Sequence, residues 1–452
     1  MNDTEHADSA LFRRWANLLG AAAIILMPWQ ARWIFAYRTL AGERYEYGTM
    51  GVYAGSVVVA LAAVFFWNAY GFRRRQVTVV CSWFAWLILM ALFAADAPFA
   101  MWTVILMVCA FGYFLIARSM ERRRLTTAII AGGILQSFIA WWQFISQRVA
   151  ASTLLGVAEH APVVLGDSVV VIFGKRVLRA YGLLPHPNIL GGFLAVALAV
   201  LVLRYIEFLG SDATPRDTRR WARYVAGILF LFSALLISFS RAALLSFVLL
   251  MILWWLLSRF QHAPALRNGV RDVLVLCAVL GIVFNFIAGN IWLQRFGVGL
   301  PKQDVATSEQ RLEEQSLSQR AQSYYEAVAL FTVRSLTIGV GPGNYVLRLS
   351  RTFAGYPSYQ YQPVHNSYIM ALVEVGALGC ILLVSLLFHL LHDAWKAAVR
   401  ATAPGMLLLP SLMLLIGCIA LFDHYLWTSY FGQSLFWLAA GCFARLSLNE
   451  TR

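Results

Sequence analysis

The stretch GVGPGNYVLRLSRTFAGYPSYQYQPVHNSYIMALVEVGALG, residues 339–379, joins a polar, aromatic loop to an apolar helix. Three glycines at its start, Gly339, Gly341 and Gly343, permit backbone turns that residues with a Cβ resist. The residues from 367 to 389 then supply the roughly twenty apolar positions that a helix needs to cross a bilayer. The pattern therefore predicts a shaped loop that enters a membrane-spanning helix through Asn366.

His365 lies at this entry, where water is expected to meet hydrocarbon. Imidazole is the side chain that accepts a proton near neutral pH, so a histidine in this place is a candidate general base. The alternative interpretation is an interfacial histidine that only caps the helix. This stretch alone leaves both interpretations open.

Composition places the chain among integral membrane proteins. Of its 452 residues, 60% are hydrophobic and 13% are charged, and the mean hydropathy is +0.68. A soluble domain of this length does not bury so much apolar surface. The net charge of +14 does not indicate nucleic-acid binding, because Lys and Arg lie in short clusters between apolar runs. The six cysteines lie in apolar runs without a CxxC pair, so we expect small core residues instead of disulfides or metal ligands.

About twelve apolar runs have the length of a membrane span, which predicts an all-α polytopic fold. These runs cover residues 17–36, 50–70, 77–95, 99–117, 125–146, 188–205, 224–239, 242–257, 272–291, 367–389, 406–422 and 428–444. The first run lacks a signal-peptide cleavage site and is expected to stay as an anchor. Most basic residues fall in short connections on one side, so both termini are predicted to be cytoplasmic.

This orientation divides the chain into tails, spans and outer loops. The predicted parts are a cytoplasmic tail at 1–16, spans one to nine at 17–291 with a periplasmic loop at 147–187, a large periplasmic loop at 292–366, spans ten to twelve at 367–444 and a cytoplasmic tail at 445–452. In the large loop, residues 317–334 have the spacing of an amphipathic helix, whereas the polar segment 302–315 is expected to be mobile.

Three arginines are predicted to lie on the same outer side as His365. Arg241 follows a turn between two runs too short for the full hydrocarbon core, so we expect it just below the outer surface, facing a cavity or a partner. Snorkelling toward lipid phosphates is the alternative for this residue. Arg179 lies in the first outer loop and Arg320 in the predicted amphipathic helix. Guanidinium groups bind phosphate through a fixed fork of donors, so the three suit a diphosphate.

Other outer polar residues give weaker signals. The outer His and Asp residues show no HxxxH or DxD spacing, so neither a metal site nor a cofactor is predicted; they are His160, Asp167, His186, Asp423 and His424. Asp423 and His424, which lie beside aromatic residues, are interpreted as part of an interface belt. Glu374 lies on the face of its helix opposite to His365 and is expected to be a buried carboxyl hydrogen-bonded to a neighbouring helix.

Three motifs occur in a fixed order along this topology. They are RAYGLLPHPNILGGFLA at 179–195, SFSRAALL at 238–245, and GVGPGNY at 339–345 followed by HNSYIMALVEVGALG at 365–379. Together they resemble the O-antigen ligase and polymerase family of bacterial membrane glycosyltransferases. The resemblance covers roughly residues 170–380 and the span number, and it implies a fold similar to that of the C-type polytopic glycosyltransferases (GT-C).

The resemblance implies an enzyme of the bacterial inner membrane that transfers a glycan from undecaprenyl diphosphate to an acceptor hydroxyl at the periplasmic face, without metal or nucleotide. It implies that His365 is the base and that Arg179 and Arg241 bind the diphosphate, with Arg320 as a looser match. Transfer to lipid A core by a ligase is favoured, because a wide aromatic loop suits a second lipid-borne sugar. A polymerase that extends another lipid-linked glycan stays open.

A transporter of lipid-linked oligosaccharides is the competing class. Twelve spans are common among transporters, and Glu374 would be its coupling site. The two halves show no repeat, however, and the charged candidates gather on one side instead of the midplane. Transport is therefore the weaker interpretation.

Overall fold

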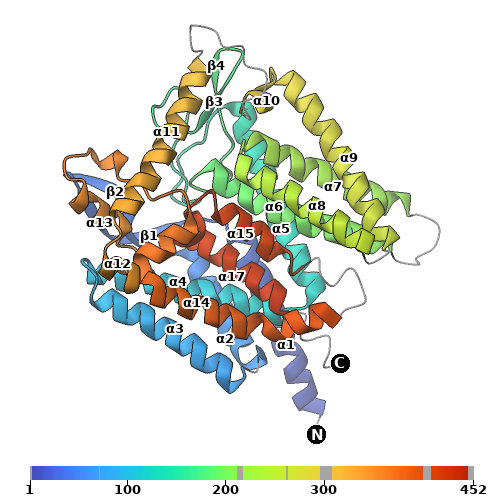
Figure 1. Ribbon diagram of the computed structural model, residues 1–452. Helices are drawn as coiled ribbons and strands as arrows, with labels where there is room; N and C mark the ends of the chain where they lie inside the picture. Colours follow the sequence, from blue (N-terminus) through green and yellow to red (C-terminus); the bar gives the residue numbers. More distant parts are fainter. Residues whose placement is uncertain are drawn as a thin grey trace.

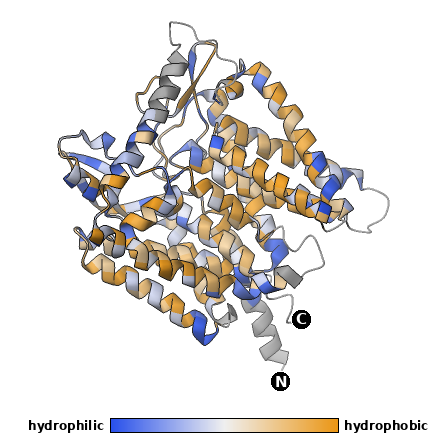
Figure 2. Cartoon of the chain, in the orientation of Figure 1, coloured by the Kyte–Doolittle hydropathy of each residue, from blue (hydrophilic) through white to orange (hydrophobic). Residues whose placement is uncertain are grey.

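A computed structural model describes residues 3–70, 72–210, 217–260, 263–295, 308–400 and 409–445. Several predictions fall partly beyond them, since residues 1–2 of the first tail, 296–307 of the large loop with its polar segment, 406–408 of one apolar run and the tail after Arg445 lie outside the described residues. The described chain is mostly helical (Figure 1). Its helices carry apolar side chains along their length, and hydrophilic colours gather toward their ends and the hairpins (Figure 2).

Eight of the described helices are long and apolar enough to cross a membrane. They are α3 (Arg74–Leu92), α4 (Ala97–Ser119), α5 (Arg122–Ser146), α6 (Pro187–Leu209), α7 (Thr218–Ile237), α8 (Arg241–Phe260), α9 (Pro264–Ile287) and α14 (Ser367–Arg400). Each coincides with one of the predicted apolar runs. The protein is therefore a polytopic membrane protein, as the composition predicts.

The other four predicted runs correspond to helices that do not meet the criteria for a span. They are α1 (Asp3–Ile25), α2 (Ala54–Tyr70), α15 (Leu412–Ala420) and α17 (Tyr430–Ala444). With 15 residues, α17 is roughly 22 Å long, against a hydrocarbon core of about 30 Å. Nearly all of its side chains are buried. Its apolar character therefore serves packing within the bundle, which hydropathy alone does not distinguish from contact with lipid.

The all-α prediction is wrong at two places, where antiparallel hairpins form. Strands β1 (Arg32–Leu40) and β2 (Glu43–Tyr53) pair through a tight turn, and β3 (Val169–Ile172) pairs with β4 (Lys175–Leu178). The predicted first span, residues 17–36, is wrong at its end, since its helix ends at Ile25 and its last residues belong to β1. Aromatic and β-branched residues fill β1, and they favour strands as much as they raise hydropathy.

One longer polar helix and several short ones accompany the hairpins at one end of the bundle. They are α10 (Ile291–Arg295), α11 (Ser308–Ala329), α12 (Val333–Thr337), α13 (Tyr345–Thr352), the 3₁₀ turn η1 (Ser358–Gln360) and α16 (Tyr425–Thr428). Figure 1 shows this polar end along the upper left of the molecule. The amphipathic helix predicted at 317–334 is present but ends at Ala329, and α11 already begins at Ser308. The segment expected to be mobile, 302–315, is thus helical from Ser308 onward, and its mobility stays a prediction.

Candidate functional site

The glycine loop packs against an opened turn of α14. Gly376 interrupts this helix with φ 68° and ψ 177°, which leaves the carbonyls of Val373 and Glu374 free of their helical partners. The loop supplies new ones, since the N–H groups of Val340 and Gly341 each donate over 2.9 Å to them. The loop thereby becomes a fixed support at the start of α14.

Gly339, Gly341 and Gly343 all have positive φ, with values of 83°, 100° and 74°. A Cβ on Gly339 would lie 2.2 Å from the carbonyl oxygen of Glu374, so only glycine fits there. Glu374 also accepts hydrogen bonds from the backbone N–H groups of Gly343 and Tyr345. Its third donor is the indole of Trp427 on α16, so this buried carboxylate joins the loop to another element.

His365 immediately precedes α14. Asn366 caps the helix, because its side-chain oxygen accepts from the backbone N–H groups of Tyr368 and Ile369 over 3.0 Å each. Its amide nitrogen donates to the carbonyl of Leu421, which ties the cap to the segment before α16. The imidazole Nδ1 of His365 is buried and has no hydrogen-bond partner among the described residues. That nitrogen is available to a ligand.

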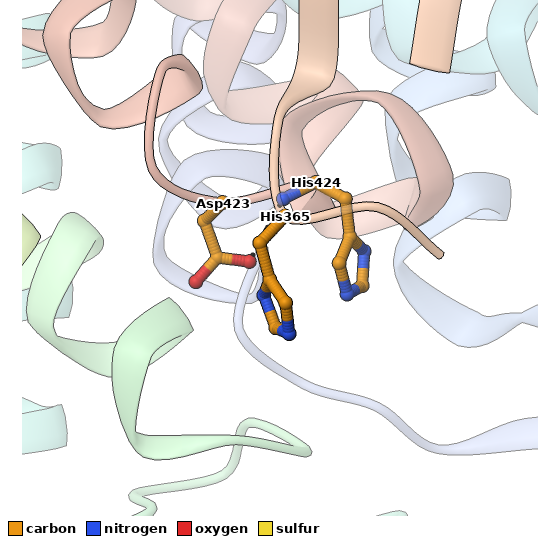
Figure 3. Close-up of side chains that lie close together, drawn as sticks. All are labelled: His365, Asp423 and His424. Atoms are coloured by element: carbon orange, nitrogen blue, oxygen red, sulfur yellow. Dashed lines mark hydrogen bonds between the residues drawn. The ribbon is translucent and has the colours of Figure 1, made fainter. Parts of the chain in front are cut away.

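Asp423 and His424 lie on either side of His365 (Figure 3). One ligand atom from each of the three side chains lies within 4.8 Å of the others. The two imidazole rings are 5.3 Å apart between centroids. Ser367 holds the two segments together through a 2.7 Å hydrogen bond to the carbonyl of Asp423. The interpretation of Asp423 and His424 as an interface belt is therefore wrong, because Asp423 is only 5% exposed and faces the candidate base.

Arg179 is connected to this group through Asn188. The guanidinium of Arg179 donates over 2.6 Å to the side-chain oxygen of Asn188, in the first turn of α6. The amide nitrogen of Asn188 donates in turn over 3.0 Å to Asp423. A second guanidinium nitrogen, Nε of Arg179, donates to the carbonyl of Ser238. Arg179 is thus fixed between the end of β4 and the turn before α8.

Three further arginines surround Arg179. Arg241 begins α8 and donates over 2.8 Å to the backbone carbonyl of Arg295 on α10. Burial lowers the pKa of Arg179 to about 9, and the nearby Arg295, Arg241 and Arg320 act in the same direction. Within the described chain, neither Arg179 nor Arg320 forms an ion pair with a carboxylate. Arg179 and Arg320 therefore bring positive charge to this end of the bundle without a carboxylate beside them in the described chain, as a candidate site for an anion requires.

The electrostatics of the group favour a neutral His365 beside an ionised Asp423. Burial lowers the pKa of His365 below 6.5, and Arg320 acts in the same direction while Asp423 opposes it. Burial lowers the pKa of His424 to about 4 and that of His186 to about 3. Burial alone would raise the pKa of Asp423, but the histidines and the Asn188 amide hold it below its ordinary value. A neutral imidazole at pH 7 is able to accept a proton.

The fold brings together outer His and Asp residues that show no HxxxH or DxD spacing in the sequence. His365, Asp423 and His424 have the mutual spacing of a metal-binding group. Both oxygens of Asp423 already accept hydrogen bonds, from Asn188 and from the backbone of His424. Nδ1 of His424 pairs with the hydroxyl of Thr428 over 2.8 Å. The arrangement offers fewer open ligand atoms than the three or four of protein zinc sites.

A cavity of about 260 Å³ lies between the β1–β2 hairpin and the segment before α6. Its polar lining consists of Arg32, Glu46, His160 and Tyr181. None of His365, Asp423 and His424 lines it, and Glu46 in its wall points to the face of β2 opposite to Tyr47, whose ring contacts His424. Its volume is slightly below the roughly 300–1,000 Å³ of pockets for drug-sized ligands.

Five residues of this site, including His424, were not assigned to it from the sequence. Asn188 and His186 lie in a motif noted for other residues, and Asp423 and Arg295 lie far from it in sequence. The one sequence signal for Asp423 is the polar pair that it forms with His424 between two apolar runs. The predicted residues are brought closer together: Arg241 and Arg320 lie within electrostatic reach of Arg179, and Arg320 also lies within reach of His365.

These elements define a polytopic membrane protein that holds arginine side chains and a buried histidine at one end of its helical bundle. Residues 226–384 match the family described as O-antigen ligase, and the chain therefore carries the domain of this family of membrane glycosyltransferases. No curated protein matches the chain. The matched segment runs from α7 into α14 and contains Arg241, Arg320 and His365, whereas Arg179 and Asp423 lie outside it.

Proposed function

We propose that the protein is a metal-independent, inverting glycosyltransferase that moves a glycan from undecaprenyl diphosphate to an acceptor hydroxyl. The observation that carries this proposal is the hydrogen-bonded path from Arg179 through Asn188 to Asp423, beside His365. It puts candidate groups for the leaving diphosphate and for the nucleophile in one place. The family match agrees with this class of substrate.

The transfer is a single displacement at the anomeric carbon of the donor sugar. The acceptor oxygen forms a bond to this carbon while the bond from the carbon to the diphosphate oxygen breaks. His365 takes the proton of the acceptor hydroxyl, and Asp423 stabilises the imidazolium that results. Arg179, Arg241, Arg295 and Arg320 stabilise the negative charge that grows on the diphosphate. The proton is then lost to water.

The topology belongs to the proposal as well. Twelve crossings of a GT-C-like fold would use the eight long helices and the four shorter ones, with both termini in the cytoplasm. The clusters of basic residues in the short connections support this orientation. The site then lies at the periplasmic face of the inner membrane, where residues 147–187 and 292–366 form the outer loops.

The acceptor we favour is lipid A core, which makes the protein an O-antigen ligase. The aromatic residues of the large outer loop, among them Tyr356, Tyr359 and Tyr361, support this acceptor, because such a loop suits a second lipid-borne sugar. A polymerase that extends another lipid-linked glycan would use the same groups, and it is the alternative. Analysis of surface glycans in a strain without the protein separates them, because a missing ligase leaves full-length chains on the carrier lipid, whereas a missing polymerase leaves single units.

Transfer by the purified protein tests the class. The protein in vesicles is supplied with undecaprenyl-diphosphate-linked glycan and lipid A core, without nucleotide or an ion gradient. The proposal requires a glycan-bearing lipid A product. A transporter would move the donor across the membrane and leave the acceptor unchanged, and this result would reject the proposal.

A further inference from the structure

We propose that the β3–β4 hairpin and the neighbouring turn at 162–165 form a membrane anchor that inserts into the lipid surface beside α9. The anchor consists of Val163, Leu165 and Phe173, with Lys175 beside them. Its partner is the border between acyl chains and acidic headgroups. This inference goes beyond the proposed function and does not depend on it.

The three apolar side chains of the anchor are unusually exposed. Val163 is 85% exposed, Leu165 88% and Phe173 75%. Exposed apolar side chains that gather on one surface mark a contact with a partner or a membrane. Within the described chain, the ring of Phe173 touches the end of α9 at Gly289 and still leaves most of its surface uncovered.

The segment is held in a defined shape despite this exposure. Arg176 on β4 donates through its guanidinium to the carbonyls of Pro162 and Val164, on either side of Val163. The turn at 162–165 is thereby fixed against the hairpin. The guanidinium of Arg176 thus hydrogen-bonds to the backbone of an apolar turn.

The tip of the hairpin carries an aromatic side chain at a position whose backbone conformation disfavours it. Phe173 and Gly174 form its two-residue turn, with φ values of 49° and 75°. Turns of this kind favour Asn or Gly at the first position, because other side chains resist positive φ. A phenylalanine there is disfavoured by backbone and by water alike, which points to a use for its ring outside the fold.

The anchor continues the lipid-facing surface of α9. The ring of Phe173 lies over Gly289, where an added Cβ would come within 2.9 Å of it. Gly289 follows the end of α9, whose last residues Phe286 and Ile287 are each 71% exposed. Because α9 is a candidate span with most of its surface uncovered, its exposed end marks the level where hydrocarbon gives way to headgroups.

The positive charge of Lys175 also favours a position of the hairpin tip at the lipid surface. Lys175 is exposed directly after the tip, and a lysine beside an apolar insertion attracts acidic headgroups. Strand β4 then leads to Arg179, at most about 20 Å further along the extended chain. An anchored tip would therefore hold Arg179 at a fixed depth below the lipid surface, which matters for a lipid-borne diphosphate if the proposed function is right.

Collision measurements on nitroxide labels test the anchor. Single cysteines replace Val163 or Leu165 in a chain without the native cysteines, reconstituted in vesicles of phosphatidylcholine and phosphatidylglycerol. Val279, on the exposed face of α9, is the control for hydrocarbon, and Glu159, in an exposed ion pair with Arg148, is the control for water. We expect high accessibility to oxygen and low accessibility to a water-soluble nickel chelate, between the values of the two controls.

Two results would overturn the anchor. Nickel accessibility equal to that of the Glu159 label would place the turn in water. Low accessibility to both reagents would place it against protein, such as a second copy of the chain. If removal of the native cysteines prevents folding, a photoreactive phenylalanine analogue at position 173 replaces the labels, and cross-links to phospholipid support the anchor whereas cross-links only to protein refute it.

A second arm tests the charge. The Leu165 label is compared in vesicles with and without phosphatidylglycerol, in the parent and in Lys175→Gln. We expect acidic lipid to reduce nickel accessibility in the parent, and this response to shrink at least twofold in Lys175→Gln. An identical response in both proteins would remove the headgroup contact from the proposal.

Discussion

The amide nitrogen of Asn188 donates a hydrogen bond of 3.0 Å to Oδ2 of Asp423, joining the start of α6 to the turn before α16. Because the oxygen of the same amide accepts from Arg179, the orientation of Asn188 is set from both sides. One side chain therefore connects the arginine cluster to the carboxylate beside His365. A substitution of Asn188 would therefore remove a hydrogen-bond partner of both Arg179 and Asp423.

Replacement of His365 by Gln should abolish transfer without unfolding the protein. Glutamine keeps a polar side chain of similar size but accepts no proton, and loss of a general base costs roughly 10²–10⁴-fold in rate. The measurement is kcat with lipid-linked donor and acceptor. His389→Gln on the same helix is the control, because its imidazole bonds only to the carbonyl of Ser385. Near-normal turnover in His365→Gln would remove this residue as the base.

The pH dependence of transfer should move in opposite directions in two variants. His365 must be neutral to accept a proton, so activity falls as the pH drops through its pKa, which lies below 6.5. Arg320→Ala removes a cation that lowers this pKa, and the acidic limb of the kcat profile should shift to higher pH. Asp423→Asn removes an anion that raises it, and the limb should shift to lower pH. Shifts in the same direction would contradict the electrostatic coupling.

Loss of a cluster arginine should weaken the use of donor more than that of acceptor. A charge-assisted hydrogen bond contributes about 1.5–3 kcal/mol, so Arg295→Ala and Arg241→Ala should raise the KM for donor roughly ten- to hundredfold. Arg348→Ala, an exposed arginine on α13, is the matched control. The KM for donor is measured at fixed acceptor concentration, and the KM for acceptor is measured at fixed donor concentration. Equal effects on both substrates would argue against diphosphate binding.

The sequence predicts the elements whose signal is local and misses those that depend on tertiary contacts. The eight long helices and the positions of His365 and Arg241 follow from hydropathy and charge along the chain. The hairpin at β1 does not, because its aromatic residues raise hydropathy as a helix would. Asp423 enters the site only because Ser367 and Asn188 hold its turn against α14 and α6, contacts between residues far apart in sequence.

Removal of divalent cations should leave transfer unchanged. Asp423 and His424 have the spacing of metal ligands, but the carboxylate oxygens and Nδ1 of His424 are engaged by other partners. Preparation of the protein in a chelator, followed by assay in the same chelator, measures any requirement. A loss of turnover that a single divalent cation restores would show that a metal takes part, and would contradict the role of His365 as a free base.

Gly376→Ala should destabilise the protein at a position that touches no substrate group. The backbone there has φ 68° and ψ 177°, a region that is essentially restricted to glycine and costs other residues about 1–3 kcal/mol. The added Cβ would also lie 2.5 Å from the carbonyl oxygen of Thr337 and 2.6 Å from the amide nitrogen of Gly339.

The resulting shift must separate the glycine loop from α14, so both the thermal midpoint in detergent and the turnover should fall. Gly281→Ala, on α9, is the matched control, since its Cβ would meet no atom within 4 Å and alanine favours the helix. If both variants melt at the same temperature as the parent, the opened turn at Gly376 does not support the loop. If Gly376→Ala melts lower and the remaining folded protein has full turnover, the loop stabilises the fold without shaping the site.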